Sequence, residues 1–167
     1  MKAGYTKKQG AAKAAIRYIA HRPGKDNTRT TRTLFGTDGA MSRQHAYAVI
    51  DEARQGSVFF RFVISPDPKL EDTFKDLYLR GITDRTMQAL AERVGKPVSW
   101  VGSVHADHAP HRHVHVVAVV PGRLQVQDFQ LLRTTATQVA LAQRKERDLV
   151  REIQKQKEQE AQWALQR

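Results

Sequence analysis

The sequence has no cysteine, which excludes disulfides, thiolate metal sites and cysteine nucleophiles. It also has no apolar run near the ~20 residues that a membrane-spanning helix needs. The first eight residues, Met1 to Lys8, lack the apolar core of a signal peptide. These absences predict a cytoplasmic protein whose chemistry depends on imidazole, hydroxyl, carboxylate and cationic groups.

Acidic side chains are scarce. The 167 residues contain 28 Lys and Arg against 17 Asp and Glu, which gives a net charge of +11. Residues 1–55 hold 11 of the basic side chains and only 4 of the acidic ones, so the positive charge is concentrated towards the N-terminus. Because a protein this basic usually binds a polyanion, we expect nucleic acid as its partner.

Helix and strand signals alternate along a chain long enough for one domain with a proper core. Residues 25–40 are polar and rich in breakers, which predicts a basic loop with one short strand. Residues 127–167 contain no Gly or Pro, which predicts one long helix or two joined ones. The order of elements predicts an α+β fold, a central antiparallel sheet with helices packed on it. The other expected helices cover 9–21, 43–55, 70–79 and 83–94, and the expected strands cover 57–65, 98–104 and 112–120.

Five of the seven histidines lie between His105 and His115. Alternate side chains of a strand share a face, so His113 and His115 point the same way, on a strand expected at the centre of the sheet. Asp107 to Pro110 carry turn chemistry, and a hairpin folded about Ala109 places His105 opposite His113. Three neutral imidazoles on one face would bind a metal ion and leave positions open for water or substrate, as catalytic sites do.

The histidine cluster has other interpretations. An expression tag is not embedded between two apolar strands. A hydrogen-bonded pair of core histidines is common, but five neighbouring imidazoles are costly to bury without a cation or solvent. The roles of His108 in the turn and of His111 at the solvent-exposed end of the strand stay open. Each could contact a ligand histidine, contact DNA or have no role.

Tyr18 lies on the first expected helix among basic side chains. Lys13, Arg17 and His21 recur one turn apart, and Arg22 follows. A helical tyrosine is most often half-buried packing, but cations beside a phenol favour a nucleophile that attacks phosphorus. The competing tyrosines, which lack these surroundings, are Tyr5, Tyr47 and Tyr78.

The helix segment Ala14-Ala-Ile-Arg-Tyr-Ile19, followed by His105 and His113-Val-His115, resembles the conjugative relaxases and mobilisation proteins of the HUH endonuclease superfamily. Rolling-circle replication initiators and related transposases of that superfamily place the tyrosine after the histidines. Here no tyrosine follows Tyr78, which favours a relaxase.

The resemblance covers residues 9–122 and implies a single catalytic domain over 1–167, with 127–167 as a helical segment and without the long C-terminal extension that such proteins often carry. Tyr18 would be the nucleophile. Asp107 would orient a ligand histidine or act as a base. The implied ligands of a divalent ion, Mn²⁺ or Mg²⁺, are His105, His113 and His115.

The implied substrate is single-stranded DNA at an origin of transfer beside a hairpin, in a bacterial cytoplasm and with accessory relaxosome proteins as further partners. The enzyme would nick one strand and stay on the 5′ end through a phosphotyrosine, which conserves the energy of the broken bond for rejoining. Ser65 resembles the serine of the family that touches DNA beside the nick. The other expected DNA contacts are Arg17, His21, Arg22, Arg29 and Arg32.

The sequence departs from the family pattern in two places. Apolar Ala118-Val-Val stands where a polar residue is usual, and the strand that often precedes the tyrosine helix is expected to be short or missing. Two functions of other classes stay open. A three-histidine metal hydrolase or oxygenase acting on a small molecule would keep its activity in Tyr18→Phe. A non-catalytic basic DNA-binding module would bind DNA with steep salt dependence and cut nothing.

Overall fold

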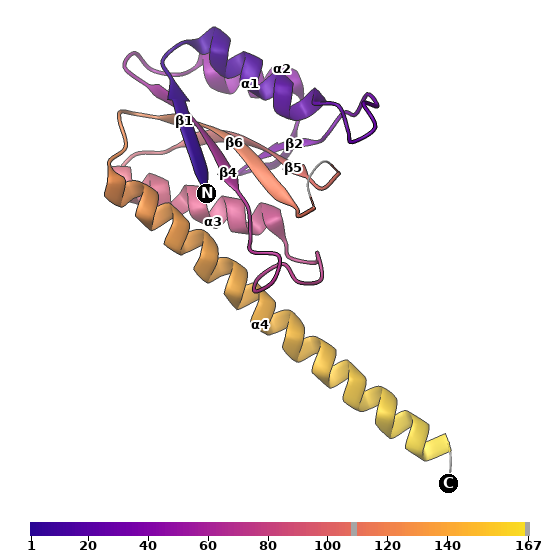
Figure 1. Ribbon diagram of the computed structural model, residues 1–167. Helices are drawn as coiled ribbons and strands as arrows, with labels where there is room; N and C mark the ends of the chain where they lie inside the picture. The colour runs from indigo at the N-terminus through magenta and orange to yellow at the C-terminus, as the bar shows by residue number, and fades with distance from the viewer. Residues whose placement is uncertain (108–109, 166–167) are drawn as a thin grey trace.

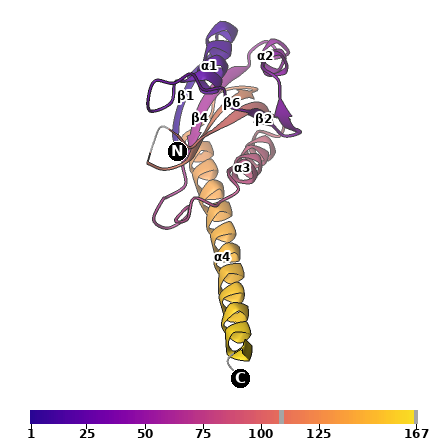
Figure 2. The same cartoon turned by 90° about the vertical axis from the view of Figure 1, so that its right-hand side faces the viewer.

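The computed structural model describes residues 1–107 and 110–165. An antiparallel six-stranded sheet lies between two layers of helices (Figure 1). Helices α1 (Gln9–His21) and α2 (Arg43–Asp51) cover one face, and α3 (Leu79–Val94) and α4 (Val126–Leu165) cover the other (Figure 2). The predicted α+β class is confirmed. The strands are β1 (Lys2–Thr6), β2 (Leu34–Gly36), β3 (Gly39–Met41), β4 (Val58–Ile64), β5 (Ser99–His105) and β6 (His113–Val120).

Strand β6 lies in the middle of the sheet, whose order is β1-β4-β6-β5-β2-β3. Alternation along the strands divides the apolar side chains between two cores. Phe62 and Val116 belong to the core under α3 and α4, whereas Phe59 and Val117 pack beneath α1 and α2. Beyond its histidines β6 is apolar on both faces, so each of its faces has to be covered by helices. The predicted central place of this strand in the sheet is confirmed.

Short elements near the N-terminus differ from expectation. The strand expected to be short or missing is present as β1, which pairs with β4 at one edge of the sheet. Residues 25–40, expected to be a loop with one short strand, contain β2 and most of β3, and these two strands are joined by a turn in which Gly39 has a φ of 105°. Helix α2 starts as expected, with the Ser42 hydroxyl accepting from the backbone N–H of His45. It ends at Asp51 rather than at residue 55, because the chain tightens into a three-residue turn there.

The helix predicted over residues 70–79 is wrong. Residues 68–75 form turns and bends instead, and side-chain carboxylates hold this segment. Asp67 accepts hydrogen bonds from two backbone N–H groups that follow it. Asp72 is buried, accepts a backbone N–H five residues later, and binds Arg112 through both oxygens at 2.8 and 2.9 Å. Carboxylates that capture backbone donors compete with helix formation, and the apolar spacing alone does not reveal them.

Helix α3 begins at Leu79, four residues before the predicted start. Thr83, the first residue of the predicted helix, is buried inside α3 and donates its hydroxyl proton to the carbonyl of Leu79. The helix ends at Gly95, whose left-handed φ of 67° suits glycine.

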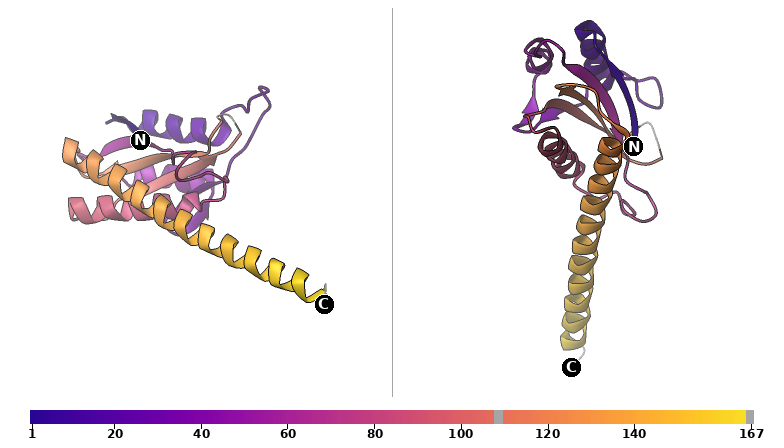
Figure 3. Two further views of the ribbon diagram at one scale, coloured as in Figure 1. Left: turned by 60° about the horizontal axis from the view of Figure 1, so that its bottom comes forward. Right: turned by 90° about the vertical axis from the view of Figure 1, so that its left-hand side faces the viewer.

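Helix α4 is one continuous helix of 40 residues, the first of the two predicted alternatives. It packs beside α3 and then extends past the sheet (Figure 3). Its direction is fixed by the turns before α3, because Asp76 accepts from Arg144 at 2.7 Å and from Arg151 at 2.9 Å. Both guanidinium groups also lie over the ring of Phe74. Within the described ranges, none of the helices has the length and apolar character needed to cross a membrane.

Candidate metal centre

Three histidines meet where β5 ends and β6 begins. His105 is the last residue of β5 and pairs with His113, the first residue of β6, as predicted. His115 lies two residues further along the same face. The ring centroids of His105 and His115 are 4.6 Å apart, and one nitrogen from each of the three rings lies within 4.8 Å of the others. This spacing would let the three imidazoles hold one metal ion.

Each imidazole keeps one nitrogen free for a metal. His105 Nε2 lies 2.8 Å from the carbonyl oxygen of Ile19, so Nε2 carries the proton and donates. The other nitrogen, Nδ1, is buried without a hydrogen-bond partner in the described part of the chain, and so is His115 Nε2. His113 Nδ1 lies 3.4 Å from the carbonyl oxygen of His111, which leaves Nε2 free. Buried, unpaired nitrogens that converge fit a divalent cation, and backbone carbonyls orient the rings as acceptors do at metal sites.

Burial keeps the triad neutral. It lowers the pKa of His105 and of His115 to about 4, and the positive charge of neighbouring side chains adds to this effect. The pKa of His113 is also lowered, again mainly by burial. Arg22 and Arg32 are the nearby cations that disfavour protonation of these rings. Near pH 7 the three imidazoles are therefore unprotonated, the form that binds a metal.

We expect the metal-free protein to lose stability as the pH falls from about 6.5 towards 4. In this window the unfolded chain binds protons that the folded histidines refuse, so the free energy of unfolding decreases, by about 3 kcal/mol for the fully buried His105. Urea unfolding at pH 7, 6 and 5 measures the effect. His115→Gln should flatten the profile, whereas a matched change at the exposed His45 should not. A wild-type profile that is flat between pH 7 and 5 contradicts the prediction.

The triad lies under the last turn of α1, which carries Tyr18. The hydrogen bond from His105 to Ile19 joins the metal centre to the residue next to the tyrosine. Tyr18 itself is 52% exposed, and the guanidinium of Arg22 lies 5.6 Å from the centroid of its ring. A groove of about 600 Å³ between α1, β1, β4 and β6 is lined by Tyr18 at α1 and by His115 at β6. The structure therefore brings the predicted phenol and one of the three predicted ligands, His115, to one groove.

The other three tyrosines lie elsewhere. Tyr5 on β1 packs against Phe60, which belongs to the core under α3 and α4. Tyr47 on α2 lies beneath the ammonium group of Lys13. Tyr78, which precedes α3, is held by two backbone hydrogen bonds to a glutamine of α4. Of the four tyrosines, Tyr18 alone lines the groove with His115.

Asp107 and Arg32 pair with each other across 75 residues of sequence. Arg32 Nε and Nη2 donate to the two oxygens of Asp107 at 3.3 and 2.6 Å, and Arg32 Nη1 donates to the carbonyl of Arg22. The hydrogen bond from Arg32 lowers the pKa of Asp107, which makes it a weaker base. Asp107 was expected to orient a ligand histidine or act as a base, and Arg32 to contact DNA. The structure adds that this pair, with the hydrogen bond to Arg22, fixes the loop after α1 beside the triad, and both expected roles stay predictions.

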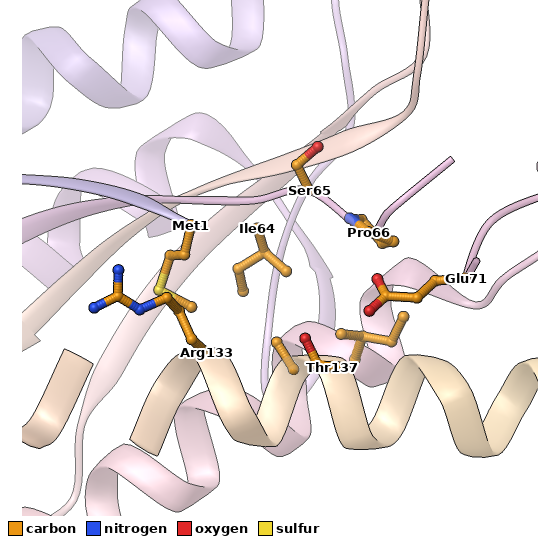
Figure 4. Close-up of a pocket in the computed structure, with 9 residues that line it drawn as sticks. Met1, Ile64, Ser65, Pro66, Glu71, Arg133 and Thr137 are labelled. Atoms are coloured by element: carbon orange, nitrogen blue, oxygen red, sulfur yellow. The ribbon is translucent and has the colours of Figure 1, made fainter. Parts of the chain in front are cut away.

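The remaining expected DNA contacts are spread around the triad. Arg17 and Arg29 are exposed, on α1 and in the loop that follows it. His21 faces α2, with Arg43 Nη1 3.4 Å from its Nε2. Ser65 follows β4. In Figure 4 its hydroxyl is directed away from α4, the helix that carries Arg133. The role of His108 falls outside the described residues.

Sequence reasoning missed Arg61. It lies on β4 opposite Gly4 of β1 and Val117 of β6, and it lines the same groove as Tyr18. The signal was present in the sequence, since Phe59-Phe-Arg-Phe62 puts a single charge inside an otherwise apolar strand. The sequence alone does not show which face of the sheet Arg61 occupies, because that depends on how the strands pair.

A scan against protein-family models, a search of curated proteins and a search of solved structures each found no match.

Proposed function

We propose that this protein is a metal-dependent DNA-nicking enzyme, a relaxase of the HUH endonuclease type. It would cut one strand at the transfer origin of a bacterial plasmid or conjugative element and hold the 5′ end on Tyr18. The observation that carries the proposal is the 2.8 Å contact between His105 Nε2 and the carbonyl of Ile19. It ties three converging imidazoles to the residue beside a half-exposed tyrosine, and a metal centre next to a free phenol is suited to phosphoryl transfer.

The reaction is a transesterification. The oxygen of Tyr18 attacks phosphorus, and the new bond forms as the bond from phosphorus to the 3′ oxygen breaks. The phenol proton passes to solvent, and the departing 3′ oxygen takes up a proton. A 3′ hydroxyl and a 5′-phosphotyrosine result, so the reverse reaction with a 3′ hydroxyl rejoins a strand.

Side chains of the groove support this chemistry. Arg22 lies 5.6 Å from the centroid of the Tyr18 ring and also disfavours protonation of His113 and His115, so its charge lies near both the nucleophile and the ligands. It would offset the negative charge of the phosphate. His105, His113 and His115 would hold Mn²⁺ or Mg²⁺, which supplies polarisation of a phosphoryl oxygen.

The charge distribution supports a DNA substrate. Residues 1–55 have 11 basic and 4 acidic side chains, an excess of +7 out of the net charge of +11, and they also contain α1 and the loop after it. Exposed cations such as Arg17 and Arg29 would bind phosphates on either side of the attacked one. Single-stranded DNA beside a hairpin is the substrate we favour, with accessory proteins of the transfer complex as partners.

The direct test uses single-stranded oligonucleotides that tile the DNA around the gene of this protein. With Mn²⁺ or Mg²⁺, wild type should give a cut strand and a protein–DNA band that survives denaturing electrophoresis, and EDTA should abolish both. Binding without cutting under Mn²⁺, Mg²⁺ and Zn²⁺ would leave a DNA-binding module. Cut products whose 5′ ends are all free of protein would indicate a hydrolase that activates water.

A further inference from the structure

Arg61 places a positive charge on the face of the sheet that α1 covers. Its neighbours along β4 on this face are Phe59, which is buried beneath α1, and Val63, which pairs with His115. The side chain reaches across the neighbouring strand, because a β-carbon built at Gly4 would stand 3.4 Å from Arg61 Nη2. Glycine at that position leaves room for the guanidinium beside β1, inside the groove that Tyr18 lines.

The groove around Arg61 is positively charged and has no acidic side chain in its lining. Lys2 stands at the β1 side, and Arg22 lies by Tyr18 at the other end. In the described part of the chain, Arg61 has no ion pair and no side-chain hydrogen bond. Guanidinium groups in protein grooves normally bind a carboxylate or a phosphate, so a groove of this kind indicates an anionic ligand.

The shape of the groove restricts that ligand. Its volume is about 600 Å³, and its helical wall is made of small side chains that leave room between α1 and β1. Tyr18 and His115 line the same groove as Arg61, so one elongated molecule could contact all three. The residues of the helical wall before Tyr18 are Ala11, Ala14 and Ala15.

We infer that this groove binds single-stranded DNA next to the attacked phosphate, with Arg61 holding the backbone phosphate that follows on one side. The inference rests on the proposed function, because the chain that enters the groove is the one that Tyr18 attacks. Lys2 extends the same path towards the edge of the sheet. The alanine wall accommodates the sugar and base, and the strand on the other side of the attacked phosphate runs over the loop after α1.

The test compares Arg61→Gln with Arg85→Gln, a matched change at an exposed arginine of α3 on the opposite face. The probe is a fluorescent thymidine oligomer of about 16 nucleotides, and anisotropy is measured from about 50 to 200 mM salt. Arg61→Gln should bind on the order of tenfold more weakly and lower the salt slope by about 0.7, the value for one lost phosphate contact. Arg85→Gln should match wild type.

A second variant tests the wall without changing charge. Ala14 is exposed on α1, so Ala14→Leu leaves the buried core intact while filling the groove. It should weaken binding of the oligomer several-fold and leave the salt slope unchanged. Thermal unfolding by circular dichroism checks that each variant is folded.

The outcomes separate this inference from the proposed function. If Arg61→Gln binds the oligomer like wild type, the groove assignment is overturned, whether or not wild type cuts DNA. If the expected losses appear but wild type never cuts, the groove stands as a DNA-binding site and the nicking function fails. A substrate that wild type cuts allows one more test, in which the DNA is shortened from the 5′ end or from the 3′ end. Shortening at one of the two ends should remove the difference in affinity between Arg61→Gln and wild type, and shortening at the other end should leave it. A difference in affinity that persists after shortening at either end contradicts a one-sided path.

Discussion

Tyr18→Phe is expected to abolish the covalent protein–DNA product and to lower strand cleavage by at least about 10⁴-fold, the scale on which loss of a nucleophile acts. The change removes one oxygen. The ring remains, so the contact with Arg22 and the packing of α1 should persist. The side chain is 52% exposed, and the stability of the fold should hardly change. Denaturing electrophoresis of a 3′-labelled strand after incubation with Mn²⁺ measures the effect, since that label stays with the protein-bound piece.

Binding measurements make this prediction sharper. The affinity of Tyr18→Phe for uncut DNA should stay within a few-fold of wild type, because the phosphates are held by cations rather than by the phenol. Tyr47→Phe is the matched control and should react like wild type, since Tyr47 lies on α2 outside the groove. A covalent band from Tyr18→Phe would remove the assignment of the nucleophile. Cleavage at the wild-type rate without any covalent band would favour the three-histidine hydrolase.

The histidine centre could be predicted because it depends on local rules. Side chains of a strand alternate, and a hairpin folded about a short turn puts residues at equal distances from that turn opposite each other. Those two facts place His105 against His113, with His115 on the same face, and the observed register agrees. Helix α1 was predicted with its observed bounds for a similar reason, since alanine-rich sequence and the breakers after His21 both act locally.

The features that sequence reasoning missed depend on contacts between distant segments. Asp72 holds a turn and binds Arg112, 40 residues away, so the segment before α3 forms turns although its apolar spacing suits a helix. Arg32 and Asp107 pair with each other across 75 residues, a contact that no local pattern in the sequence indicates. The role of Arg61 depends on which strand lies beside β4 and on Gly4 in that strand. No local pattern contains this information.

Removal of one ligand should show whether the triad is a metal centre. His115→Ala is expected to weaken binding of Mn²⁺ by at least about a hundredfold, more than the loss of a group that merely orients a ligand, and to stop metal-dependent cleavage. His115 suits the test because its Nε2 is unpaired, whereas Nε2 of the fully buried His105 binds the carbonyl of Ile19. Substitution at His105 would disturb α1 as well as the metal. At His115, by contrast, a loss of function can be assigned to the loss of the imidazole.

Two measurements separate loss of metal from loss of structure. Isothermal titration with Mn²⁺ gives the affinity directly, and the thermal midpoint with and without Mn²⁺ gives it through linkage. An ion present at about 100 times its dissociation constant stabilises the wild-type fold by about 2.7 kcal/mol. That stabilisation should vanish in His115→Ala, while the midpoint of the metal-free variant should stay close to that of metal-free wild type, because the variant no longer buries the unpaired Nε2 of His115. His45→Ala on the exposed side of α2 should behave like wild type in both measurements. A His115→Ala protein that binds Mn²⁺ as tightly as wild type would mean that the converging nitrogens do not hold the ion, and cleavage through this centre would have to be given up.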